Sequence, residues 1–182
     1  MKQLLVIEYL RKWLEDKFGQ RLTVKSDHTG EGREELGLFL TPKLRGEGRS
    51  QRIAQVDIIG LNEIEKRVQF VIEVDPVSTP KKLLGDLAAV ALADNHTPSN
   101  CFESYKIEGA SFFFLTVLSD NPASGKRRQY ESLETATLSL YSSLSNKLTN
   151  IRLCHGVDSQ EMISAFQAAI ETIYFSSVDV EF

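Results

Sequence analysis

The sequence has few cysteines, no long apolar run and no overall excess of basic residues. Its 182 residues include two cysteines, Cys101 and Cys154, which lie far apart and outside any CxxC spacing. A disulfide framework is therefore not expected, and a reducing, cytoplasmic location is the default expectation. The longest mostly apolar stretches, 68–74 and 112–118, fall far short of the about 20 residues that a membrane-spanning helix requires. The sequence predicts no transmembrane segment and, because Glu8 interrupts the first apolar run, no secretory signal.

The net charge of −4 argues against a protein that is basic over its whole surface. The charge is distributed unevenly, since residues 1–52 carry eleven Lys and Arg against eight Asp and Glu, whereas the rest carry ten against seventeen. Two local basic clusters are compatible with contact to phosphate groups. The phosphate-contact candidates are Arg45, Arg49, Arg52 and Arg127, with Lys43, Lys126 and Arg128 beside them. Solvated surface loops are the alternative explanation of such clusters.

The periodicity of apolar residues predicts one domain, residues 1–182, of the α/β class. Helices are expected at 2–18, from Ser78 or Thr79 to about Asn95, at 126–147 and after Asp158. Strands are expected at 21–25, 36–40, 52–60, 67–75, 111–118 and 150–155, with a hairpin connector at 62–66. The apolar run 111–118 is typical of a strand covered on both faces. This order predicts a mixed central sheet flanked by helices.

Three acids lie among apolar residues in two of these expected strands. Strand alternation sends Glu73 and Asp75 to one face of the strand that ends at Asp75. If the hairpin turns about Glu65, Asp57 lies opposite Glu73 on the same face, whereas a one-residue slip would turn it away. The sequence therefore predicts a pair of neighbouring carboxylates, Asp57 and Glu73.

Two ionised carboxylates at such a distance repel, so one pKa must rise or a cation must lie between them. Oxygen donors suit Mg²⁺ or Mn²⁺, and Mg²⁺ usually takes one or two carboxylates, keeps several waters and meets a substrate phosphate. Such an ion would polarise a phosphodiester and activate a bound water, which Asp75 could orient or deprotonate. Solvated acids paired with Arg52, Arg67 or Lys82 are the alternative.

This pattern, Asp57 followed by a hairpin and then Glu73-Val74-Asp75, resembles the PD-(D/E)xK nuclease superfamily and its restriction-endonuclease-like fold. The segment FVIEVDPVSTPKKLLGDLAAVALAD is similar to the strand, short Ser/Thr loop and apolar helix of restriction-type members. The resemblance covers about residues 50–95. It implies Asp57, Glu73 and the backbone carbonyl of Val74 as metal ligands, and an acid of the first helix, Glu8 or Glu15, as a further ligand.

The sequence departs from the family pattern at two positions. No proline precedes Asp57, and Asp75 stands where the family has its lysine. The resemblance allows a lysine of the next helix to take that place, which makes Lys82, or its neighbour Lys81, the candidate.

The function implied is a Mg²⁺- or Mn²⁺-dependent DNA endonuclease with Asp57, Glu73, Asp75 and Lys82 as catalytic residues. Two cuts on a duplex would require two sites, so a homodimer is plausible by the same analogy. The alternative is a non-catalytic member of the same fold that acts as a scaffold or binds a partner. That alternative predicts no Mg²⁺ affinity, a salt link from Asp75 to Lys81 or Lys82, and Asp57 turned away from Glu73.

Overall fold

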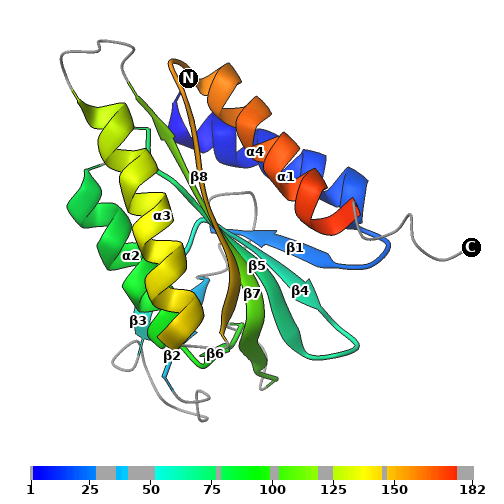
Figure 1. The fold of residues 1–182 in the computed structure, drawn as a ribbon. Helices are drawn as coiled ribbons and strands as arrows, with labels where there is room; N and C mark the ends of the chain where they lie inside the picture. Colours follow the sequence, from blue (N-terminus) through cyan, green and yellow to red (C-terminus); the bar gives the residue numbers. More distant parts are fainter. Residues whose placement is uncertain are drawn as a thin grey trace, which may run out of the picture.

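The computed structural model describes residues 2–27, 36–40, 52–76, 79–98, 103–118, 125–144 and 147–175. Within these ranges the chain forms a mixed sheet of eight strands covered by four helices (Figure 1). The α/β class and the central sheet between helices agree with the sequence prediction. No helix in these ranges is long and apolar enough to cross a membrane.

In the described ranges, five strands follow the first helix, and the three further helices alternate with the remaining strands. The helices are α1 (Gln3–Phe18), α2 (Pro80–Leu92), α3 (Lys126–Leu144) and α4 (Ser159–Phe175). The strands are β1 (Thr23–Ser26), β2 (Gly37–Phe39), β3 (Arg52–Gln55), β4 (Ile58–Asn62), β5 (Arg67–Val74), β6 (Asn95–His96), β7 (Tyr105–Val117) and β8 (Leu148–Gly156).

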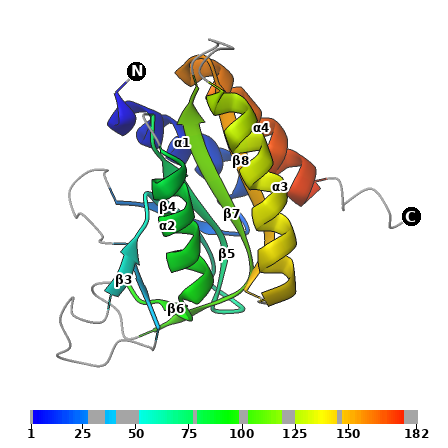
Figure 2. The same ribbon diagram turned by 60° about the vertical axis from the view of Figure 1, so that its left-hand side comes forward.

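The strands follow the order β1-β4-β5-β7-β6-β2-β3, and β8 pairs with β7. β1, β4 and β5 form an antiparallel meander, whereas β5, β7 and β8 run parallel and are joined through α2 and α3. Parallel neighbours require such crossover connections, and successive crossovers place the starts of their helices at one edge of the sheet. The carboxyl ends of β5 and β7 therefore lie at the same edge as the first turns of α2 and α3 (Figure 2).

The two faces of the sheet bury separate apolar clusters. α2 and α3 cover one face, where Val71, Phe112 and Phe114 of the sheet and Leu83 and Leu87 of α2 belong to one apolar cluster. α1 and α4 cover the other face (Figure 1), which receives alternate residues of the same strands. That cluster includes Phe70, Ile72, Val74, Phe113, Leu115 and Phe166. The predicted alternation along β5 and the burial of β7 on both faces are thus confirmed.

The first turn of α2 forms as its sequence predicts. Thr79 is the N-cap, and its hydroxyl accepts a hydrogen bond from the Lys82 amide at 3.3 Å. Pro80 occupies the first helical position, where a missing amide proton costs no hydrogen bond. The helix ends at Leu92, before the expected Asn95, because Asn95 and His96 form the unpredicted strand β6.

The expected single strand 52–60 is wrong, because the chain bends at Val56 and Asp57 and forms two strands. β3 pairs with β2, whereas β4 lies between β1 and β5. The two segments have different partners and cannot continue as one extended strand. Asp57 lies in the bend, so a candidate acid occupies the junction between them.

Candidate functional site

The candidate acids lie at the carboxyl end of β5, beside the first turns of α2. Glu73 belongs to β5, Asp75 follows its last residue, and Lys82 is in the first turn of α2. Asp57 reaches this place from the bend before β4. The side chains of Asp57 and Glu73 are both buried, with 8% and 7% of their surface exposed.

Asp57 and Glu73 are neighbours across the β4–β5 pair, as the hairpin register predicted. Ile58 pairs with Ile72, and continuing that antiparallel register by one residue sets Asp57 opposite Glu73. Asp57 Oδ2 also accepts a hydrogen bond from the Val74 amide at 2.8 Å. The bend is therefore tied to the end of β5, and the Asp57 carboxylate lies beside that of Glu73.

The electrostatic environment of Glu73 reflects this pairing. Burial raises the pKa of Glu73 well above its ordinary value of 4.5, and the nearby Asp57 and Asp86 carboxylates raise it further. The Lys82 ammonium acts in the opposite direction. Without a bound cation, burial and the neighbouring Asp57 carboxylate therefore favour the protonated form of Glu73.

Lys82 links two further carboxylates. Its Nζ lies 2.8 Å from Asp75 Oδ2 and 3.9 Å from Asp86 Oδ2. Burial alone would lower the pKa of Lys82, but Asp75, Asp86 and Glu73 together raise it above the ordinary value. Lys82 is therefore held as a cation at the acid pair, with about half of its side chain exposed.

Asp86 belongs to this site, and the sequence reasoning missed it. Burial raises the pKa of Asp86; Lys82 lowers it, and Asp75 and Asp57 raise it again. Its Oδ2 is buried and has no hydrogen-bond partner among the described residues. The signal was present in the sequence, since Asp86 lies four residues after Lys82 and hence on the same face of α2.

A second missed acid, Asp27, follows the end of β1. Ser26 pairs with Ile58, so the same antiparallel register sets Asp27 beside Asp57. The Asp27 amide donates to the Asp57 carbonyl at 3.0 Å, and Gln55 Nε2 donates to the Asp27 carboxylate. Asp27 is thus a buried neighbour that fixes the backbone of the bend.

The Val74 carbonyl, which the resemblance implied as a metal ligand, accepts a hydrogen bond from Gln3 Nε2 at 2.6 Å. The first helix therefore does reach the end of β5, but through Gln3. The expectation for Glu8 and Glu15 finds no support, because Glu8 pairs with Lys12 and Glu15 pairs with Arg11 along α1. Moreover, α1 covers the face of the sheet opposite to Glu73.

Of the arginines predicted to contact phosphate, the described structure places only Arg127 at the same edge of the sheet as the acids. Arg45 and Arg49 lie outside the described residues. Arg52 begins β3, at the end of that strand away from Asp57. Arg127 is in the first turn of α3, where its Nε lies 3.9 Å from Glu131 Oε1, at the same edge of the sheet as the acids.

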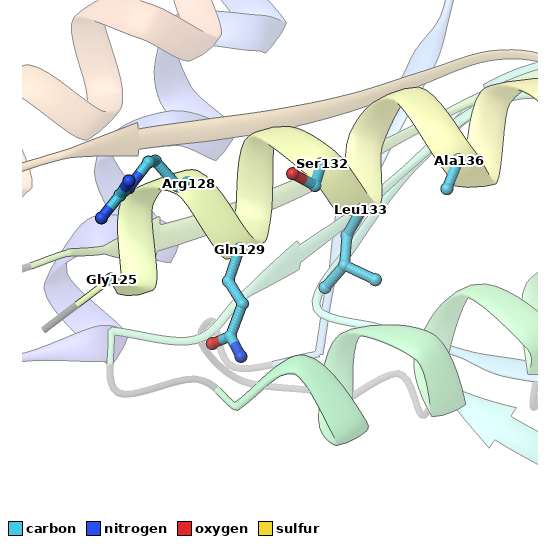
Figure 3. A pocket seen from close by; sticks show the side chains of 6 residues that line it. All are labelled: Gly125, Arg128, Gln129, Ser132, Leu133 and Ala136. Carbon is cyan, nitrogen blue, oxygen red and sulfur yellow. The ribbon is translucent and has the colours of Figure 1, made fainter.

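An open groove runs along the first turns of α3, on the side that faces α2 (Figure 3). Gln129 and Leu133 point from α3 toward α2, and Arg128 lies at the end of the groove nearest the start of the helix. The lining residues are Gly125, Arg128, Gln129, Ser132, Leu133 and Ala136. The groove thus combines an apolar wall with one amide, one hydroxyl and one cation.

Among the described residues, no three His, Cys, Asp or Glu side chains converge as a ready-made metal centre. The donor set is the carboxylate pair Asp57 and Glu73, with Asp86 and Asp75 held nearby through Lys82. Comparison of the chain with protein-family models, curated proteins and solved structures gives no match.

Proposed function

We propose that this protein is a metal-dependent DNA endonuclease that hydrolyses phosphodiester bonds. In this proposal Asp57 and Glu73 hold the Mg²⁺ or Mn²⁺ ion. The observation that carries the proposal is the burial of these two carboxylates side by side at the end of β5. Such an arrangement is unfavourable unless a proton or a cation is shared between the groups. Oxygen donors of this kind are those that Mg²⁺ prefers.

Two carboxylates match what Mg²⁺ usually takes from a protein, because waters and a substrate phosphate complete its coordination. The absence of a three-residue cluster in the described ranges is compatible with this mode. The Val74 carbonyl is the third donor in the proposal. It already accepts from Gln3, but a carbonyl oxygen has two lone pairs and can serve a second partner.

The side chains around the carboxylate pair have different chemical roles in this proposal. The bound ion supplies polarisation of the phosphodiester and a lowered pKa for an attacking water. Lys82 keeps its proton, because its pKa is raised, so Nζ donates to a phosphate oxygen and offsets charge that develops in the transition state. Asp75, which follows β5, accepts a hydrogen bond from the attacking water and then its proton.

A second candidate function is a non-catalytic scaffold of the same architecture. The salt link between Lys82 and Asp75, at 2.8 Å, is the contact that this alternative predicted. Its other structural prediction is not met, because Asp57 lies beside Glu73 and does not turn away. Metal affinity separates the two candidates.

Calorimetric titration of Mg²⁺ and of Mn²⁺ into the protein tests the proposal. Binding to the wild type should disappear in Asp57→Asn/Glu73→Gln, which removes both charges and keeps the side-chain shapes. Glu8→Gln/Glu15→Gln, which removes two acids from α1, is the matched control and should bind as the wild type does. The scaffold would be favoured if Asp57→Asn/Glu73→Gln bound the metal as tightly as the wild type does. It would also be favoured if none of the three proteins bound metal in the presence of a DNA oligonucleotide.

Cleavage is the second readout. The wild type should cut DNA with Mg²⁺ or Mn²⁺ and stop when the metal is chelated, and Asp57→Ala should be inactive but folded. Cleavage by Asp57→Ala at the wild-type rate would overturn the assignment of the site. The homodimer expected for cutting both strands of a duplex stays a prediction, which sedimentation of the purified protein measures.

A further inference from the structure

The groove on α3 has features that the proposed reaction leaves unexplained. It is open, has a volume of about 590 Å³, and extends from Gly125 to Ala136. Eleven residues of helix correspond to about 16 Å. Volumes of this size are typical of sites for small organic groups. The groove is therefore large enough for a planar ring with its attached sugar.

The wall of the groove combines an apolar surface with a small number of polar groups. Leu133 and Ala136 supply aliphatic surface, and Gln129 points across the groove toward α2 with an amide that both donates and accepts (Figure 3). Gly125 has a positive φ of 62°, and a Cβ placed there would meet no atom of the described residues within 4 Å. As far as these residues are concerned, the backbone at the mouth of the groove is therefore open to a ligand.

Three consecutive cations begin α3 at this mouth, Lys126, Arg127 and Arg128. Arg127 pairs with Glu131, whereas Arg128 lines the groove and none of the lining residues is acidic. The start of a helix also favours an anion through its aligned peptide dipoles. The groove is thus complementary to a ligand with an apolar, hydrogen-bonding ring and an adjacent phosphate.

The position of the groove connects it to the acid site. α2 and α3 both begin at the sheet edge where β5 and β7 end (Figure 2). Asp75 and Lys82 flank the start of α2, while Arg128 marks the start of the groove on α3. The acid site and the start of the groove therefore lie at the same edge of the sheet.

We propose that the α3 groove binds an unpaired nucleobase of single-stranded DNA, with Gln129 contacting the base edge and Arg128 the adjacent phosphate. This inference rests on the proposed nuclease function and specifies its substrate as a strand with exposed bases. A base within a duplex is stacked and paired, so it cannot enter a groove on a helix without being extruded. Single strands offer base faces and edges directly, and arginine planes and amides recognise them.

The test is fluorescence anisotropy with a short labelled single-stranded deoxyoligonucleotide, measured in the inactive Asp57→Asn background without divalent metal. Gln129→Leu should weaken binding by about fivefold, since one hydrogen bond to the base edge is lost. Ala136→Glu, which brings a negative charge and bulk into the groove, should weaken it by about tenfold or more. Gln160→Leu, an exposed glutamine on α4, is the matched control and should bind as the parent does.

Two comparisons make the proposal falsifiable. An abasic oligonucleotide of the same length should bind more weakly than the base-containing strand and should not distinguish Gln129→Leu from its parent. A blunt duplex of the same sequence should also bind more weakly than the single strand. Equal affinity of the parent for the base-containing and abasic strands, or unchanged binding by both groove variants, would overturn the proposal.

Failure of the groove and failure of the nuclease site give different results. Bis(p-nitrophenyl) phosphate, a phosphodiester without a nucleobase, reports the acid site, so the wild type should hydrolyse it with Mn²⁺ and Asp57→Asn should not. If the groove variants lose oligonucleotide binding but the wild type does not hydrolyse this phosphodiester, the nuclease site is refuted and the groove proposal stands. Hydrolysis with no effect of the groove variants on DNA binding would refute the groove and leave the site.

Discussion

The Val74 amide donates a hydrogen bond to Asp57 Oδ2 at 2.8 Å, across 17 residues of sequence. Because Val74 is next to Glu73, this bond sets the separation of the two buried carboxylates. The bond engages one oxygen of the Asp57 carboxylate, Oδ2. The pair is therefore positioned by backbone as well as by the register of β4 and β5.

Stability without metal should fall as the pH rises above the ordinary pKa of Glu73, 4.5. The folded pKa is raised by burial and by Asp57, so the folded protein binds the proton more tightly than the unfolded chain does. This contribution is fully present below pH 4.5 and is lost as the pH rises through the folded pKa. Thermal unfolding in a chelator across pH 4–8 measures it.

Glu73→Gln should flatten this decline and raise the melting temperature at neutral pH, since no charge is then buried beside Asp57. Asp86→Asn is the comparison, because burial also raises the pKa of Asp86, and it should remove a smaller part of the decline. Adding Mg²⁺ at neutral pH should stabilise the wild type and not Glu73→Gln. An identical pH profile for wild type and Glu73→Gln would contradict the coupling.

Lys82→Met should lower the rate of DNA cleavage by about 100-fold or more, because it removes the only cation shown at the acid pair within the described residues. The free energy of unfolding should change by less than about 1 kcal/mol, since half of the side chain is exposed to solvent. Lys81→Met is the control, and its rate should match the wild type. Comparable rates for both variants would assign Lys82 to a purely structural ion pair.

Gln3→Ala should destabilise the protein by about 1 kcal/mol, because it removes the bond that ties α1 to the Val74 carbonyl. Gln3→Glu sets a carboxylate against that carbonyl, so it should be less stable than Gln3→Ala without metal. If the Val74 carbonyl faces a bound ion, Mg²⁺ should restore more stability to Gln3→Glu than to Gln3→Ala. Melting temperatures with and without Mg²⁺ decide this, and equal gains would exclude Val74 as a ligand.

Replacement of two glycines by alanine should change the free energy of unfolding in opposite directions. At Gly60 a Cβ would overlap the ring of buried Phe70, so Gly60→Ala should cost about 1–3 kcal/mol through overpacking. At Gly85, within α2, a Cβ would meet nothing within 4 Å, so Gly85→Ala should stabilise by about 0.5–1 kcal/mol. Urea unfolding of both variants measures the difference, and a neutral Gly60→Ala would refute the packing at that position.

Local patterns predicted most of the elements. The periodicity of α1, the Thr79-Pro80 start of α2 and the apolar run of β7 each carry their own signal, and the structure agrees with all three. The hairpin register also followed from alternation, since a slip would have exposed the apolar face of β5. The carboxylate pair could therefore be predicted before the fold was known.

The pairing of strands that are distant in the sequence could not be predicted. The run 52–60 has the composition of one strand, and only its pairing with distant segments divides it at Asp57. Asn95 and His96 carry a helix-end pattern, yet they pair with β2 and β7. His96 is fully buried, with its Nδ1 2.9 Å from the Gly37 carbonyl. Such contacts depend on residues far away in the sequence.

The bend at Asp57 also has a dynamic consequence. β3 and β4 are consecutive in the chain, but β4 is second and β3 is last in the hydrogen-bonded strand order, so the bend at Asp57 connects two separate positions in the sheet. An ion that immobilises Asp57 would restrain this bend and, through it, β3. Amide hydrogen exchange in β2 and β3 would then slow when the site is loaded, although neither strand contributes a ligand. Occupancy of the carboxylate pair would thus be reported at the far edge of the sheet.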